Sequence, residues 1–492
     1  VLFRRAPFSP FGNFLRPLNG GREAMQKPEA CLASDDAAGT HRSSLKAKSV
    51  DAVANPRAEL DFYQLVPAAL GVGITTGVLV TMFNVSVKEA QSSLGISRER
   101  SVEKLCLMPA AGGVAVGALL VLKKMFGITW TMPDVATLRK DTLGTSTRGR
   151  NAVLGLFAHV SAGVISLGFA NSLGPMLLRV QIGSAVSALV ANQLELIVSE
   201  RDLLLTSGIA AGVAAGAGAP MAAVVYGLEQ VWPAASERLI HIAFGMIGAA
   251  SAMAASLQTL SVAPALKALA HEEVNIHKIE FMVCALLGCL CGAHSWLFVN
   301  VLKPQAACGW TVAQRCGIAR ECHPALAGAA AGLAVWMIGI EVLFMGWSNF
   351  QQVLLKSSEF SVSFLAVLSI SKLMLTAMAN TSGLPGGLFA PALFAGAALG
   401  GAVGGLFKQA AALIEHQAFY SAGMSVAINE RVYTTVGMAS SLGTLCGAPG
   451  TALVLVFELT RDYDLVLPCL WGIGSGAITN AFLEHLRTRR TS

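Results

Sequence analysis

The sequence predicts an all-α, polytopic membrane protein. Of its 492 residues, 54% are hydrophobic and only 13% are charged, which is about half the charged share of a typical soluble domain. Uncharged runs recur along the chain, and about 20 apolar residues are enough to cross a bilayer as a helix. This composition excludes a nucleic-acid-binding protein, a disordered chain and a secreted disulfide scaffold.

The excess of basic residues lies at the two ends of the chain. Lysine and arginine outnumber aspartate and glutamate in residues 1–57 and in the tail 484–492, so the body between them is neutral overall. Residues 1–57 lack the apolar stretch of a secretory signal. They are expected to be either an organelle transit sequence or a disordered cytoplasmic tail. No soluble regulatory domain is expected after the last span, and the basic end favours a cytoplasmic or stromal C-terminus.

The membrane body is expected to consist of two inverted halves, residues 58–280 and 281–483. Candidate spans are the uncharged runs 62–87, 105–122, 151–178, 203–228, 239–266, 281–302, 324–340, 373–407, 432–457 and 465–483.

Three of these runs are interrupted by glycine and proline. The breaks lie at 216–220, 382–387 and 446–450, where proline lacks an N–H and glycine weakens a helix. Each run is therefore predicted to form two shorter helices that meet near the middle of the membrane. Paired breaks of this kind in both halves of a chain indicate a midplane ion or substrate site.

Other chemistry has little support in the sequence. Three cysteines and a histidine lie between residues 308 and 323, but they lack the C-x2–4-C spacing of a structural zinc site. No Walker loop, dinucleotide fingerprint or hydrolase motif in a fitting context is present. No enzyme activity, metal site or cofactor is expected.

Two segments of the second half are specific. The first runs from Ser382 to Pro391 (SGLPGGLFAP), and the second from Gly447 to Pro468, including Tyr463 and the stretch LVLP. Together they resemble the CLC family of chloride channels and chloride/proton antiporters. Two first-half segments, NSLGPMLLRVQIG from Asn171 and the A-P…L-E-Q helix from Ala219, are similar to further motifs of that family. The NSLGP opening looks most like the plant and algal organelle branch.

The resemblance implies a chloride site built from neutral groups. Backbone N–H groups would come from Gly387, Leu388, Phe389 and Ala390, and a hydroxyl from Tyr463. Neutral groups can hold an anion in this way, because a helix N-terminus offers free N–H groups and about half a positive charge. The poorly matched first-half motif puts Trp130 where the family has a chloride-binding serine, and leaves Thr129 or Thr131 as the candidate that supplies a further hydroxyl.

Three departures from the family pattern bear on mechanism. The gating glutamate position falls on Met176, followed by Leu177 and Leu178 where the family has glycine and proline. The added bulk is expected to narrow the path. The internal proton-carrying position falls on Gln230, while Glu229 beside it is retained. Both proton-carrying positions are therefore neutral, which argues for passive flow over coupled exchange.

The expected function is passage of chloride, with nitrate also considered, through a passive channel whose voltage dependence stays open. The resemblance implies a homodimer with one path per subunit, no cofactor and no nucleic-acid partner. An organelle membrane, such as a chloroplast membrane, is the expected location. Two alternatives remain: a chloride/proton antiporter that uses Glu229 or Glu341, and a non-conducting paralogue.

Overall fold

A computed structural model describes residues 62–95, 102–127, 150–231, 238–256, 278–343, 359–418 and 429–491. The chain divides into two units, Val1–Gln64 and Leu65–Ser492, and the second unit contains the helical body. The expected N-terminal region 1–57 and the candidate ligand Thr131 lie outside the described residues.

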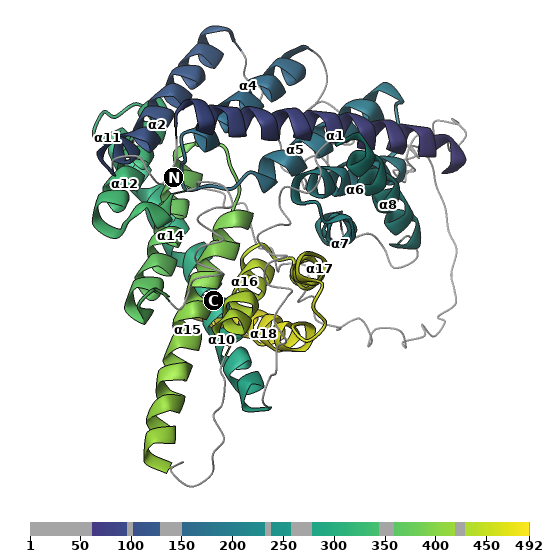
Figure 1. The fold of residues 1–492 in the computed structure, drawn as a ribbon. Helices are drawn as coiled ribbons and strands as arrows, with labels where there is room; N and C mark the ends of the chain where they lie inside the picture. Colours follow the sequence, from purple (N-terminus) through teal and green to yellow (C-terminus); the bar gives the residue numbers. More distant parts are fainter. Residues whose placement is uncertain are drawn as a thin grey trace, which may run out of the picture. The chain divides into compact units, whose positions relative to one another are not determined.

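The described residues are almost entirely helical (Figure 1). The first half contains α1 (Phe62–Ser93), α2 (Val102–Met125), α4 (Arg150–Gly168), α5 (Met176–Gln193), α6 (Val198–Ala217), α7 (Pro220–Val231) and α8 (Arg238–Ala255). The second half contains α10 (Lys278–Leu297), η2 (Phe298–Leu302), α11 (Lys303–Arg315), η3 (Arg320–Cys322), α12 (His323–Ile338), η4 (Ile340–Val342), α14 (Val362–Ser382), α15 (Phe389–Ala418), α16 (Glu430–Leu445), α17 (Pro449–Thr460) and α18 (Val466–Thr491).

The helices confirm a multi-pass membrane protein. Within the described residues, 7 helical segments are long and apolar enough to cross a bilayer. They are Leu65–Ser93, Glu103–Met125, Arg238–Ala255, Ile279–Arg315, Val362–Ser382, Phe389–Ala412 and Val466–Arg489.

All three predicted breaks are present. The run 203–228 divides between α6 and α7, the run 373–407 between α14 and α15, and the run 432–457 between α16 and α17. Gly218 ends α6 with φ +66°, and Gly383 ends α14 with φ +99°. Both values lie in the left-handed region that glycine adopts without steric cost, which is why these helices stop where they do. A further break, between α4 and α5, lies inside the run 151–178.

The two halves repeat the same packing pattern. In the first half α6 packs against α5, α7 and α8, and in the second α16 packs against α15, α17 and α18. The glycines at the contacts also repeat. A Cβ on Gly183 of α5 would lie 1.9 Å from the carbonyl oxygen of Gly208 on α6, and one on Gly396 of α15 would lie 2.2 Å from that of Gly437 on α16. Each of these pairs lets two backbones approach closely.

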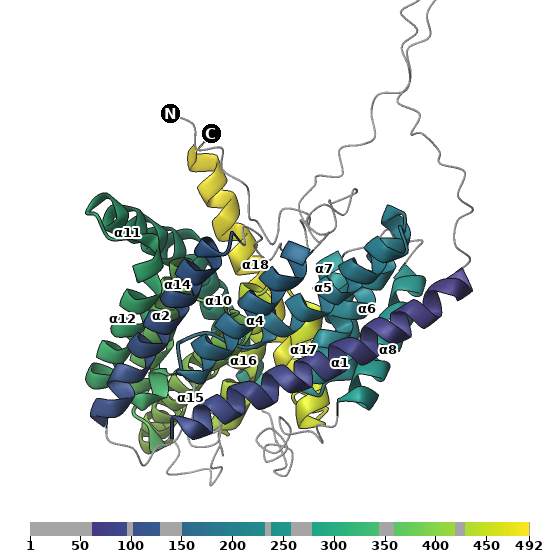
Figure 2. The ribbon, with the colours of Figure 1, turned by 90° about the horizontal axis from the view of Figure 1, so that it is seen from above.

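Equivalent helices of the two halves also touch each other. Helix α2 packs against α12 and α7 against α17 (Figures 1 and 2). At the first contact, Gly113 lies against the carbonyl of Pro324, and Gly328 lies against that of Pro109. This reciprocity is what a two-fold relation between the halves requires, and it confirms the predicted double repeat.

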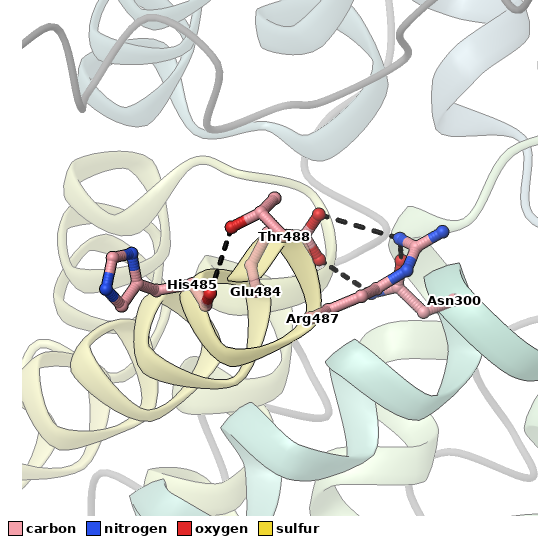
Figure 3. A network of polar contacts seen from close by, with 5 residues as sticks. All are labelled: Asn300, Glu484, His485, Arg487 and Thr488. Carbon is pink, nitrogen blue, oxygen red and sulfur yellow. Dashed lines mark hydrogen bonds and ion pairs between the residues drawn. The ribbon is translucent and has the colours of Figure 1, made fainter. Parts of the chain in front are cut away.

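The last helix extends past the predicted end of the membrane body. Helix α18 continues to Thr491, so the basic residues after 483 are helical. Figure 3 shows how these turns are held: Asn300 of η2 donates from Nδ2 to Glu484 Oε2 at 3.1 Å, and Arg487 donates to Asn300 Oδ1. Arg487 also lies 3.5 Å from Glu484. The network ties the end of α18 to the π-helical turn between α10 and α11.

Candidate functional site

Two helix N-termini, one from each half, meet through a backbone bridge. Gly174 lies just before α5 and Gly387 just before α15. The N–H of Gly174 donates to the carbonyl of Gly387 at 2.8 Å, and the N–H of Gly387 donates to the carbonyl of Gly174 at 2.7 Å. This antiparallel pair is an isolated bridge. It brings the starts of α5 and α15 together although the two glycines are more than 200 residues apart in the chain.

Glycine at these two positions makes the close approach possible. A Cβ on Gly387 would lie 2.6 Å from Leu177 Cβ and 2.9 Å from the Leu177 nitrogen. A Cβ on Gly174 would lie 2.8 Å from Ala390 Cβ and 3.1 Å from the Ala390 nitrogen. Real Cβ atoms do not approach so closely, so any side chain here would push the two helix starts apart.

The first-turn amides of both helices have no hydrogen-bond acceptor among the described residues. In α5 these are the N–H groups of Met176, Leu177 and Leu178, and Pro175 gives no side-chain cap. In α15 they are those of Phe389 and Ala390, together with Leu388 before it. Such uncapped starts bind anions, because each combines free N–H groups with the positive end of the helix dipole.

The other pair of equivalent breaks is closed by carboxylates. Glu229, near the end of α7, accepts from the Gly450 N–H at 2.7 Å, from the Thr451 N–H at 3.2 Å and from the Thr451 hydroxyl at 2.5 Å, all at the start of α17. Glu458, near the end of α17, accepts from the N–H groups of Met221 and Ala222 at 3.1 and 2.9 Å at the start of α7.

These reciprocal carboxylate caps distinguish the starts of α7 and α17 from the starts of α5 and α15. The N-termini of α7 and α17 already hold an anionic group of the protein, whereas those of α5 and α15 hold none among the described residues. Helices α7 and α17 must also run antiparallel, since each carboxylate reaches the opposite end of its neighbour. The candidate anion site therefore lies where α5 and α15 begin.

The predicted gate position is apolar. Met176 is 5% exposed and Leu178 is fully buried, with its side chain against Gly163. Leu177 is 38% exposed and lies beside Gly387 at the paired helix starts. Among Met176, Leu177 and Leu178, Leu177 is the one whose side chain begins beside Gly387 at the paired helix starts.

The predicted chloride ligands of α15 are placed at this site, and Tyr463 is found elsewhere. Leu388 and Ala390 are half-buried, and Phe389 is 7% exposed with its ring 6.4 Å from that of Tyr226 on α7, edge to face. Tyr463 lies between α17 and α18, is 77% exposed, and its ring contacts that of Phe457 at 4.7 Å. The role of Tyr463 as a ligand stays a prediction.

The two residues at the predicted proton-pathway position differ in their surroundings. Gln230 is half-buried on α7, while the adjacent Glu229 is held by the three donors at the start of α17. Glu341, the second acid considered for exchange, is 8% exposed in the short η4 turn.

Sequence reasoning missed several residues that shape the site. Thr376 of α14 donates to the carbonyl of Ser172 at 3.0 Å and so anchors the segment before α5. Two of the cations buried among the described residues are Arg179 of α5 and Lys372 of α14, which donates to the Val342 carbonyl at 2.6 Å. The cap by Glu458 had a signal in the sequence, because Glu458 follows Pro449 by the same nine residues that separate Glu229 from Pro220.

The described cysteines are free thiols, and those at 308, 316 and 322 are exposed. No cluster of three or more metal-ligating side chains occurs among the residues that the structure describes.

A family model described as "Voltage gated chloride channel" matches residues 140–480. The chain belongs to this family. It is 30% identical over 448 residues to chloride channel protein CLC-e of Arabidopsis thaliana, covering 86% of this chain and 61% of that protein. It is 27% identical over 322 residues to the H(+)/Cl(-) exchange transporter ClcA of Salmonella typhi, covering 63% of this chain and 62% of that protein.

Solved structures of the family share the fold. A slow cyanobacterial Cl-/H+ antiporter aligns with a TM-score of 0.64 and 19% identity, covering 85% of this chain and 95% of the antiporter chain. A eukaryotic CLC transporter aligns with a TM-score of 0.61 and 17% identity, covering 85% of this chain and 72% of the other. The chain spans about half to three fifths of the length of the Arabidopsis relatives that it matches.

Proposed function

We propose that this chain forms a passive anion channel, selective for small anions of the chloride type, with the anion held where α5 and α15 begin. The observation that carries the proposal is the pairing of two uncapped helix N-termini through Gly174 and Gly387. Their free amides attract an anion without a mobile counter-charge, so binding is moderate and the ion can leave again.

Passive flow, rather than exchange, is supported by the absence of a free acid at the site among the described residues. Coupled exchange needs a group that takes up and releases a proton during each cycle. Met176 cannot do so, and neither can Gln230. Glu229 accepts three hydrogen bonds at the start of α17, so releasing it for proton transport would leave that helix end without its acceptor.

A chloride/proton antiporter is the second candidate. It is favoured by similarity to the ClcA exchange transporter and to the cyanobacterial antiporter. An antiporter built on this chain would have to use an acid other than the family's two, and Glu341 is the remaining one considered.

A homodimer with one path per subunit, and residence in a plant-type organelle membrane, complete the proposal. The organelle assignment rests on similarity to the Arabidopsis proteins and on the basic N-terminal region.

The test is anion flux into liposomes that contain the purified chain, measured with and without a pH gradient. A passive channel lets chloride follow its own gradient and gives no uphill proton movement. Chloride-driven proton uptake would overturn the channel assignment in favour of exchange. Absence of flux in protein that still folds would favour a non-conducting paralogue.

A further inference from the structure

Arg179 is a formal charge buried one turn into α5. Its side chain is 9% exposed, and its backbone N–H makes the first hydrogen bond of the helix, to the Pro175 carbonyl at 3.2 Å. The three amides immediately before it are the uncapped donors that α5 contributes to the site. Along the helix axis, about 4.5 Å separates its Cα from that of Met176.

The neighbouring helices are shaped to hold this guanidinium. Nε donates to Asn84 Oδ1 of α1 at 2.9 Å, and Nη1 donates to the Gly216 carbonyl of α6 at 2.9 Å. A Cβ on Gly216 would lie 2.3 Å from Arg179 Cδ, so glycine at this position leaves room for the arginine side chain.

The charge has no acidic partner among the described residues. Both acceptors are neutral oxygens, and no carboxylate of the described residues lies within ion-pair distance of the guanidinium. Buried charges in proteins are normally paired, because removing a charge from water costs several kcal/mol.

Helix dipoles do not supply the missing negative charge. The C-terminal end of α6, where Gly216 lies, carries about half a negative charge, and the N-terminal end of α5 carries about half a positive charge. These two contributions roughly cancel, which leaves the full charge of Arg179 beside the uncapped amides. A mobile anion at the start of α5 would balance it.

We propose that Arg179 is the fixed cation of the anion path, and that its charge sets the affinity for the transported anion and the rejection of cations. This inference rests on the proposed function, because it places the anion at the paired starts of α5 and α15. Arg179 acts on the anion through its electric field, since its side chain is directed toward α1 and α6.

The field is strong enough to measure. At a separation of roughly 10 Å and an effective dielectric constant of about 20, one unit charge changes the affinity for a monovalent anion by about an order of magnitude. Arg179→Gln should therefore weaken chloride binding roughly tenfold, whereas Arg179→Lys, which keeps the charge, should stay within about threefold of the wild type.

Asn84→Asp provides a test that keeps the arginine in place. The new carboxylate keeps the oxygen that already accepts from Nε, so it pairs the charge while the arginine keeps this contact. We expect chloride affinity to fall about as much as in Arg179→Gln, with thermal stability unchanged or raised. If Arg179 only packs α5 against α6, Asn84→Asp will leave chloride affinity unchanged, and that result overturns the proposal.

Chloride binding is measured by calorimetry on the purified full chain in detergent, and the half-saturating chloride concentration by flux into liposomes. Lys408→Gln is the matched control, since Lys408 lies near the opposite end of α15 in an exposed ion pair with Glu430 at 2.9 Å. It should leave affinity unchanged. Wild-type protein that binds chloride but carries no flux contradicts the channel assignment alone. Flux and binding that are equal in wild type, Arg179→Gln and Asn84→Asp contradict the role of Arg179 alone.

Discussion

Neutralising Glu229 tests whether this acid closes a helix end or carries protons. In Glu229→Gln the remaining oxygen can keep the two bonds from Thr451, but the other oxygen becomes an NH2 group that faces the Gly450 N–H. The start of α17 thus loses an anionic cap that now accepts bonds of 2.7, 3.2 and 2.5 Å.

The expected cost is set by these contacts. Hydrogen bonds to a charged group contribute about 1.5–3 kcal/mol, against about 1 kcal/mol for neutral ones. An anion at a helix N-terminus adds up to about 2 kcal/mol when partly buried. Weakening two bonds and losing the third should destabilise the protein by about 3 kcal/mol. Glu458→Gln, with two bonds of 3.1 and 2.9 Å, should cost about 2 kcal/mol.

The assay is reversible unfolding of the purified chain in mixed micelles by titration with a denaturing detergent, followed by helix circular dichroism. Glu484→Gln is the control, because a glutamine oxygen can still accept from Asn300, and the half-exposed pair with Arg487 at 3.5 Å contributes less than about 1 kcal/mol. Anion flux through Glu229→Gln should remain insensitive to a pH gradient. Unchanged stability together with altered proton movement would refute the capping role and support exchange.

Three further outcomes are expected at the site. Met176→Glu restores a titratable gate, so flux into liposomes should slow at neutral pH and recover as the pH falls; flux that ignores pH would mean that the gate lies elsewhere. Leu177→Ala removes apolar bulk beside Gly387 and should raise flux several-fold, while an unchanged rate would show that this side chain does not limit the path. Gly387→Ala would bring a Cβ to 2.6 Å from Leu177 Cβ and should abolish flux and chloride binding. In the control Gly474→Ala the new Cβ has no atom within 4 Å, so helix stability should rise by about 1 kcal/mol. Full activity in Gly387→Ala would contradict the paired-start geometry.

Most of the architecture could be predicted from the sequence, because the signals for spans and breaks are local. A run of uncharged residues has to lie in lipid or in a buried core, and Gly218 and Gly383 end their helices through their own backbone conformation. The three predicted breaks therefore appear where glycine and proline interrupt the runs.

The site was predictable only in part. The motif around Phe389 correctly placed a helix start, but nothing local to it identifies Gly174 as its partner. Thr131 lies outside the described residues, and the exposure of Tyr463 depends on how the segment between α17 and α18 lies against Phe457. The burial of Arg179 was also unforeseen, since a charge count locates a cation in the chain without saying which helices will surround it.

Composition and local pattern were sufficient to predict a helical membrane body with broken helices, because both depend on the identity of residues at neighbouring positions. Which helix ends stay open to an anion and which are closed by Glu229 and Glu458 was decided by the folded chain. The donors of one helix start and the carboxylate that reaches it come from opposite halves, and only packing brings them within hydrogen-bond distance.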